Sequence, residues 1–314
     1  MNFDLFDFER VVPKRLLDFY LDKLSSDADR RSIESMYNGL IEQGPGYIEE
    51  AFSRYQYAGR TAVNIFQEIT LPSGFLTKEK MEILLRKELG VENIYQEFRP
   101  PLSDTPQINF VEDHGDKILI QFVVKSKERR VRDGYEIRAV TGINFEIAIV
   151  HFLGPTLVEL RCAYNMHGKF LACFEGLFRM APSYESSKFE WIPITKVSNF
   201  EAEQIATVLS AGLIEADHKD SGIYDRHLVT ANPAIRDLRQ EREYVEAFKN
   251  KMLLSQVLII SYHEKTSLGD RISDIRFKIN LHTGFQFLSK VSEPVIEYVM
   301  QVFLDVRYLG KIKY

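Results

Sequence analysis

The sequence predicts an α+β fold, in which a helical amino-terminal domain precedes a mostly antiparallel sheet and a carboxyl-terminal part of mixed helices and strands. Three observations lead to this prediction. Apolar residues recur at helical spacing in the first ~95 residues. Short segments rich in β-branched residues, separated by glycine-containing turns, follow between residues 117 and 163. Helix-like and strand-like segments then alternate through the rest of the sequence.

A proline-rich segment supplies the clearest boundary. Residues 99–106 contain three prolines, and proline removes a backbone donor and fixes φ, so no regular structure is expected there. We therefore expect a helical domain over residues 1–98, this linker, an antiparallel β-rich domain over residues 107–196, and an αβ part over residues 197–314. The last part can share the core of the β-rich domain.

Four helices are expected before the linker. Apolar residues spaced three or four positions apart indicate them in the segments 12–20, 33–40, 48–55 and 81–89. Thr77 and Gly90 predict where the fourth of these helices begins and ends, because threonine is a favourable N-cap and glycine a favourable C-cap.

Five strands with intervening turns are expected in the β-rich domain. They lie in residues 117–124, 135–141, 143–152, 156–163 and 188–195. Turn residues separate them at Asp133-Gly134, Gly142 and Gly154-Pro155. Apolar residues alternate with polar or small ones from Ile143 to Ile149, which predicts a strand with one buried face.

The carboxyl-terminal part is expected to contain three helices and three strands. Ser198 and Glu201 match a capping box at the start of the first helix. A longer amphipathic helix is expected over residues 233–252, and the last helix begins near Ser292 and Pro294. The expected strands cover residues 256–262, 272–281 and 285–288.

Composition indicates a globular protein of a reducing compartment. Hydrophobic residues make up 45% of the 314 residues and charged residues 27%, a balance that excludes a chain disordered throughout. Cys162 and Cys173 are too few for a disulfide framework. The sequence has no secretory signal pattern and no apolar run long enough to cross a bilayer. We therefore expect a cytoplasmic protein that does not insert into membranes.

Motifs of the common enzyme classes are absent. The chain contains no Walker-type phosphate loop, no dinucleotide-binding glycine motif, no HExxH zinc motif and no GxSxG nucleophile elbow. A carboxylate-x-lysine element, as found in many metal-dependent nucleases, occurs at Asp217-x-Lys219, in a segment expected to be a polar loop. The balance is against an enzyme, and we expect no cofactor.

A basic segment among the strands is the first candidate site. Residues 125–132 contain five basic side chains and one acidic one, on a hairpin that turns at Asp133-Gly134. Arginine and lysine on such a hairpin can contact nucleic-acid phosphates. The candidate phosphate-binding residues are Lys125, Lys127 and Arg129, expected on one face, and Arg130 and Arg132, expected on the other. An acidic protein surface would suit the same charges, and so would a solvated tip that protects a strand edge.

An acidic and histidine-rich segment is the second candidate site. Six side chains with oxygen or nitrogen ligands lie within thirteen residues: Glu215, Asp217, His218, Asp220, Asp225 and His227. Carboxylates and imidazoles together suit a divalent transition metal. The spacing does not match a calcium-binding loop, and a solvated connection between a helix and a strand accounts for the same residues.

These observations favour a non-catalytic subunit of an intracellular complex that binds nucleic acid, or assists assembly, through the basic hairpin. The net charge of −5 means that such binding must be local. One alternative is a metal-dependent hydrolase, such as a nuclease, that uses Asp217, His218, Asp220 and His227. Another is a protein-interaction scaffold whose hairpin contacts an acidic partner. The amphipathic pattern of residues 233–252 also suits a protein partner or a second copy of the chain.

Overall fold

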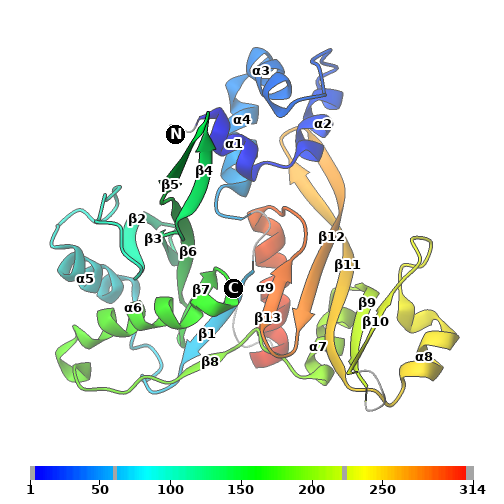
Figure 1. Cartoon of the computed structure of the whole chain (residues 1–314). Helices are drawn as coiled ribbons and strands as arrows, with labels where there is room; N and C mark the ends of the chain where they lie inside the picture. The colour runs from blue at the N-terminus through cyan, green and yellow to red at the C-terminus, as the bar shows by residue number, and fades with distance from the viewer. Residues whose placement is uncertain (1–3, 59–61, 221–224, 309–314) are drawn as a thin grey trace. The chain divides into compact units, whose positions relative to one another are not determined.

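The computed structural model describes residues 4–58, 62–220 and 225–308. It confirms the α+β class: helices begin the chain, and every strand pair in these described ranges is antiparallel (Figure 1). The chain forms two compact units. We call residues 62–195 the continuous unit, and residues 1–61 together with residues 196–314 the discontinuous unit.

The discontinuous unit begins with a small helical bundle. Its helices are α1 (Leu5–Val11), α2 (Lys14–Lys23), α3 (Ile33–Gln43) and α4 (Pro45–Tyr55). The side chains of Asp4 and Ser32 accept hydrogen bonds from backbone N–H groups in the first turns of α1 and α3, which is why the two helices begin there. Phe8, Leu17 and Leu40 are fully buried in the shared core. The three helices predicted between residues 12 and 55 are confirmed.

The same unit contains a five-stranded sheet with the order β10-β9-β11-β12-β13. Its strands are β9 (Gly212–Lys219), β10 (Arg226–Thr230), β11 (Leu253–Thr266), β12 (Gly269–Asn280) and β13 (Gly284–Phe287). The helical elements are α7 (Asn199–Val208), η3 (Leu238–Gln240), α8 (Arg242–Phe248) and α9 (Glu293–Tyr308). The predicted capping box of Ser198 and Glu201 is present at the start of α7.

The β11–β12 hairpin connects this sheet to the helical bundle. Its strands pair without interruption from Ser255 opposite Asn280 to Thr266 opposite Gly269. At the hairpin end, Leu268 packs against the core of the bundle, and the backbone N–H of Ser267 donates to the Glu50 carboxylate of α4 at 3.1 Å. The amino-terminal helices and the carboxyl-terminal strands therefore fold as one unit.

The continuous unit is built on a six-stranded sheet with the order β2-β3-β6-β7-β1-β8. Its strands are β1 (Asn64–Glu68), β2 (Gln107–Asp113), β3 (Lys117–Lys125), β6 (Ile143–Phe152), β7 (Thr156–Arg161) and β8 (Trp191–Pro193). Its helical elements are α5 (Lys78–Leu89), α6 (His167–Arg179), η1 (Tyr164–Met166) and η2 (Pro182–Tyr184). Helices α5 and α6 pack on one face of the sheet, where Phe122, Phe174 and Phe178 form an aromatic core. A separate two-stranded ribbon, β4–β5, completes the unit.

The packing groups the chain differently from the predicted domain boundaries. Residues 99–106 lack helix and strand, as expected, but β1 and α5 precede them and pack with the strands that follow them. Strand β1 lies between β7 and β8, so residues 62–98 belong to the same sheet and core as residues 107–195. Thr77 and Gly90 do cap α5, as predicted.

Two local predictions are wrong, and helix α6 was missed. Residues 233–252 do not form one long helix but only η3 and the short α8. Residues 212–219 form β9 instead of a polar loop, because β11 pairs along one edge of this strand and β10 along the other. Helix α6 was not predicted at all, although its buried apolar residues have helical spacing. None of the helices in the described ranges is long and apolar enough to span a membrane.

Candidate functional site

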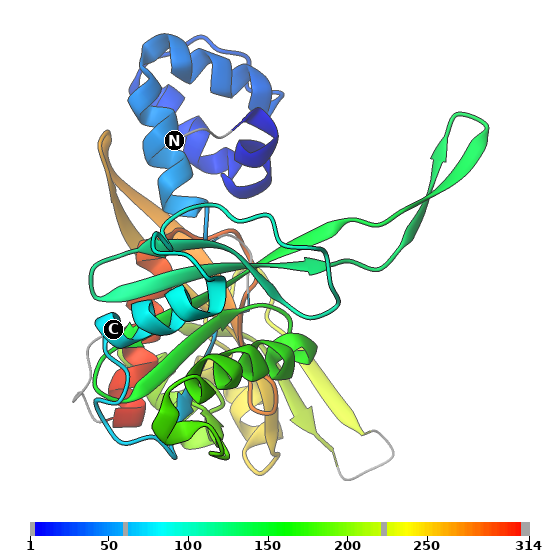
Figure 2. The same cartoon turned by 90° about the vertical axis from the view of Figure 1, so that its left-hand side faces the viewer.

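The basic hairpin forms an exposed β-ribbon, which we call the arm and define as residues 125–143. Strands β4 (Arg129–Asp133) and β5 (Glu136–Val140) pair only with each other, and all ten of their residues are exposed. Gly134 begins the two-residue turn with φ 63°, a left-handed conformation that glycine adopts without strain. Figure 2 shows the arm projecting well beyond the six-stranded sheet of its own unit.

The register of the arm separates its charges onto two unlike faces. Residues directly opposite each other in an antiparallel pair lie on the same face. Arg138 therefore shares a face with Asp133 and Glu136, and it forms ion pairs with them at 3.1 Å and 3.4 Å. Arg130 and Arg132 lie on the other face, opposite Ala139 and Ile137. That second face carries two arginines and no carboxylate within β4 and β5.

The five predicted phosphate-binding residues are all exposed, but they do not all lie on one strand. Lys125 ends β3, Lys127 lies in the connection, and the three arginines lie on β4. The predicted separation of Arg129 from Arg130 and Arg132 agrees with the observed register. None of the five forms an ion pair with any residue that the structure describes. Sequence reasoning missed Arg138, because its place beside β4 follows only from the strand register.

Exposed apolar side chains lie on the arm together with the arginines. Ile137 is 65% exposed, and Val131, Val140 and Ile143 are exposed as well. Tyr135 at the turn is fully exposed. A two-stranded hairpin without a sheet beneath it is at best marginally stable, and exposed apolar side chains beside a charged rim are typical of a binding surface. The arm therefore presents exposed basic and apolar side chains side by side.

A partly buried carboxylate lies at the base of the arm. Glu146 of β6 is opposite Phe122 of β3 and so points toward the aromatic core of the continuous unit. Loss of solvation is the cause that raises the pKa of the Glu146 carboxyl from its ordinary value near 4.5 to about 7. Its protonated form is thus favoured in the folded state.

Replacing Glu146 with glutamine is expected to stabilise the protein above pH 7. The raised pKa means that the folded state binds the proton more tightly than the unfolded state, so stability falls as pH rises from about 4.5 to about 7. Glutamine cannot ionise, so it removes this penalty. The expected gain in the free energy of unfolding is about 1–2 kcal/mol at pH 8, after allowance for partial exposure, and no gain is expected at pH 4. Urea unfolding at the two pH values measures the difference. The exposed Glu128→Gln serves as the control, and an equal effect of Glu146→Gln at both pH values would contradict the prediction.

The second candidate site lies on the β9–β10 hairpin, where protein groups already engage its side chains. Asp217 forms an ion pair with Arg226. The His218 ring donates to or accepts from the Tyr244 hydroxyl at 2.9 Å and stacks on Phe248. Burial among these groups lowers the pKa of the His218 imidazole.

Asp220 and His227, the other two of the four residues assigned to a metal-dependent hydrolase, form a pair of their own. Asp220 and His227 approach to 2.5 Å, and Lys251 lies 3.4 Å from the same carboxylate oxygen. Asp217 and His218 are adjacent on β9 and so point to opposite faces. Within the described residues, no three His, Cys, Asp or Glu side chains are grouped so that they could hold a metal ion. This geometry gives the metal-dependent hydrolase hypothesis no support.

Comparison with known proteins assigns no family to the chain. No protein-family model matches it, and no curated protein matches it. Function must therefore be inferred from the arm and from the surroundings of its residues.

Proposed function

We propose that this chain is a non-catalytic nucleic-acid-binding subunit of an intracellular complex, and that the arm contacts the phosphates. The observation that carries the proposal is the face of the arm that presents Arg130 and Arg132 without a carboxylate. Arginine is suited to this contact because its planar guanidinium matches phosphate oxygens in pairs. The free thiols of Cys162 and Cys173 suit the reducing compartment in which such a complex would act.

The shape of the arm supports the same proposal. A two-stranded ribbon fits the major groove of B-form DNA, which is about 12 Å wide. Arg130 and Arg132 are two positions apart on one strand, so their side chains leave the ribbon about 7 Å apart along it. Two neighbouring phosphates could be contacted at once from such a row. Tyr135 at the tip offers an aromatic ring on which an unpaired base could stack.

The charge of the whole chain makes the arm the decisive element. With a net charge of −5, the chain as a whole repels a polyanion, so binding must depend on a local basic surface. Contacts to phosphates release counterions, and the affinity should therefore fall steeply as salt is raised.

Reversing the charge of Arg130 and Arg132 tests the proposal. The double variant Arg130→Glu with Arg132→Glu should bind DNA or RNA at least about tenfold more weakly than the wild type at low salt. Its log–log salt slope should be shallower by about 2, since two phosphate contacts are lost. The measurement is fluorescence anisotropy with single- and double-stranded oligonucleotides across a salt series. The melting temperature should barely change, because both side chains are exposed.

A matched control makes the same change in net charge elsewhere. Arg242 and Lys249 are exposed residues in and after α8. The double variant Arg242→Glu with Lys249→Glu should retain nucleic-acid affinity within about twofold, because salt screens exposed charges that do not contact the ligand. Equal losses in the two double variants would show only a net-charge effect. A wild type that binds no nucleic acid at low salt would overturn the proposal.

A protein-interaction scaffold is the second candidate function, and the apolar side chains of the arm favour it. Ile137 and Val140 are exposed beside the arginines, and protein interfaces combine apolar contacts with arginine in this way. An acidic protein surface would then replace the phosphates. Binding of oligonucleotides to the wild type at low salt separates the two functions, because a wild type that binds none of them leaves an acidic protein surface as the partner of the arm.

A further inference from the structure

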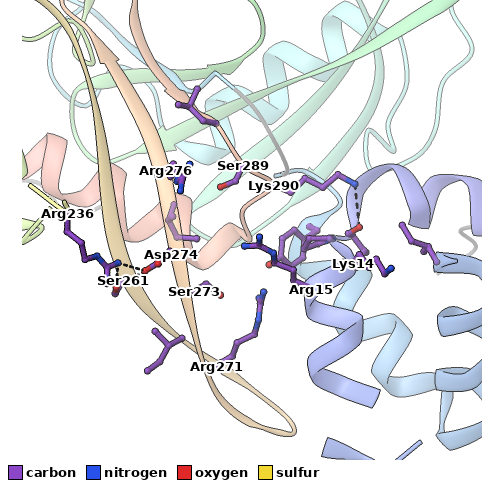
Figure 3. Close-up of a pocket in the computed structure, with 17 residues that line it drawn as sticks. Lys14, Arg15, Arg236, Ser261, Arg271, Ser273, Asp274, Arg276, Ser289 and Lys290 are labelled. Carbon is purple, nitrogen blue, oxygen red and sulfur yellow. Dashed lines mark hydrogen bonds and ion pairs between the residues drawn. The ribbon is translucent and has the colours of Figure 1, made fainter. Parts of the chain in front are cut away.

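A cavity of about 1040 Å³ lies in the discontinuous unit, and cationic side chains dominate its lining (Figure 3). Figure 3 shows Lys14 and Arg15 at the start of α2, Arg271 and Arg276 on β12, and Arg236 and Lys290 on segments outside both elements. The six cationic residues are Lys14, Arg15, Arg236, Arg271, Arg276 and Lys290. Asp274 is the one carboxylate among the described lining residues. The cavity is therefore strongly positive.

Part of this charge is balanced within the protein, and part is not. Arg236 forms an ion pair with Asp274 at 2.8 Å, and Arg271 pairs with the buried Glu264 at 3.2 Å. Lys14 and Arg15 form no ion pair with any described residue, whereas Arg276 lies on the same face of β12 as Asp274 and interacts with its charge. An anion in the cavity would supply the missing countercharge.

The amino terminus of α2 adds to the positive potential. Lys14 and Arg15 are the first two residues of this ten-residue helix, and its N-cap Pro13 provides no side-chain hydrogen bond to the free N–H groups of the first turn. Such N–H groups, together with the helix dipole, favour anions. Lys290 donates to the carbonyl oxygens of Glu9 and Val12 at 3.1 Å and 3.4 Å, and burial lowers the pKa of its ammonium group.

Two hydroxyl groups in the lining also lack partners. The Oγ atoms of Ser273 and Ser289 are buried and form no hydrogen bond with any described residue. A buried hydroxyl without a partner destabilises a fold, so such groups in native proteins usually have a bound partner or a role. Oxygen atoms of an anionic ligand would accept from both hydroxyls.

We propose that this cavity binds a small ligand with two or three linked phosphates, either free oligophosphate or the phosphate chain of a nucleotide. Two cations without an ion pair, Lys14 and Arg15, together with a helix amino terminus and two donor hydroxyls, suit more negative charge than one phosphate carries. Ile33, Ile272 and Leu288 line the rest of the cavity and leave an apolar wall for an uncharged portion. This site is independent of the arm, which belongs to the continuous unit.

Isothermal titration calorimetry on the full chain tests the proposal with three probes: inorganic triphosphate, ATP and orthophosphate. Triphosphate should bind at least about tenfold more tightly than orthophosphate, because more charge-assisted hydrogen bonds form. ATP that binds more tightly than triphosphate identifies a nucleotide as the ligand, and equal affinities identify the free oligophosphate.

Variants of the lining show whether the cavity is the site. Lys14→Ala and Arg15→Ala should each weaken triphosphate binding about tenfold or more, and Ser273→Ala with Ser289→Ala about three- to tenfold. The serine variant preserves every charge and loses only unpartnered hydroxyls, so its melting temperature should not fall below that of the wild type. Absence of triphosphate binding, or equal binding by the wild type and all these variants, would overturn the proposal.

The arm variant serves as the matched control. Arg130→Glu with Arg132→Glu changes more charge than any single lining variant, yet it should bind triphosphate as the wild type does. Loss of nucleic-acid binding in that variant with intact triphosphate binding separates the two sites. The opposite pattern, in which the arm variant loses triphosphate and the lining variants keep it, would assign the oligophosphate to the arm and exclude the cavity.

Discussion

Glu264→Ala is expected to lower the free energy of unfolding by about 3–5 kcal/mol, the range for removing one partner of a buried ion pair. The Glu264 side chain is only 2% exposed, and its two carboxylate oxygens lie 3.4 Å from Arg54 and 3.2 Å from Arg271. Arg54 keeps a second partner in Glu50, but the variant leaves Arg271 without its carboxylate. The cost therefore arises mainly at Arg271, a residue of the cationic cavity.

Denaturant unfolding followed by circular dichroism measures this loss. Glu246→Ala is the control, because Glu246 pairs with Arg242 on the solvent side of α8 and is 65% exposed. Such an exposed pair contributes about 0.5 kcal/mol at most. A Glu264 variant no less stable than the Glu246 variant would show that the buried pair adds nothing to stability.

Phe178→Ala is expected to have a loss of similar size in the continuous unit, about 3–5 kcal/mol. The Phe178 ring is fully buried and lies within 6.3 Å, centroid to centroid, of Phe75, Phe174, Phe189 and Trp191. Alanine would leave a cavity among rings that belong to one strand, one helix and two loops. Rigid neighbours of this kind cannot collapse far into the space.

The single tryptophan makes this variant straightforward to follow. Trp191 belongs to the continuous unit, so its fluorescence reports the unfolding of that unit. Ile83→Ala is the matched control in the same unit, because the Ile83 side chain is 59% exposed on α5 and should change stability by no more than about 0.5 kcal/mol. A loss below about 1 kcal/mol for Phe178→Ala would mean that the aromatic core repacks easily.

The parts of the fold that the sequence predicted correctly depend on local signals. Thr77, Gly90 and Ser198 cap helices where their side chains or backbone conformations require it, since these preferences act over three or four residues. Likewise, an apolar run in β11 and the alternation of Ile275, Phe277 and Ile279 with polar residues in β12 are local patterns that identify the two strands.

The parts that were missed depend on distant residues. Asn64–Glu68 becomes a strand because β7 and β8, nearly a hundred residues or more later, pair with it. The predicted helix over residues 233–252 is interrupted because Asp237 accepts a hydrogen bond from the Leu213 backbone N–H and also binds Arg239. Phe170, Phe174 and Phe178 are spaced four residues apart, and this spacing is a local pattern that would have predicted helix α6.

The candidate sites differ in the same way. The charges of the arm are consecutive in sequence, so their concentration was visible, but the face free of carboxylates required the register of β4 and β5. The cationic cavity gave no sequence signal. Its residues come from α2, β12 and segments near residues 236 and 290, and only folding brings them together.

The division of one unit into two stretches of chain has a consequence for synthesis. As the chain leaves the ribosome, residues 62–195 emerge as one stretch and can fold as soon as β8 has been made. Helices α1–α4 emerge first, yet the hairpin end with Ser267 and Leu268 that covers part of their core is made some two hundred residues later. During that interval the amino-terminal helices expose apolar surface that only the late strands cover, and this is the stage of biogenesis at which a chaperone would protect the nascent chain.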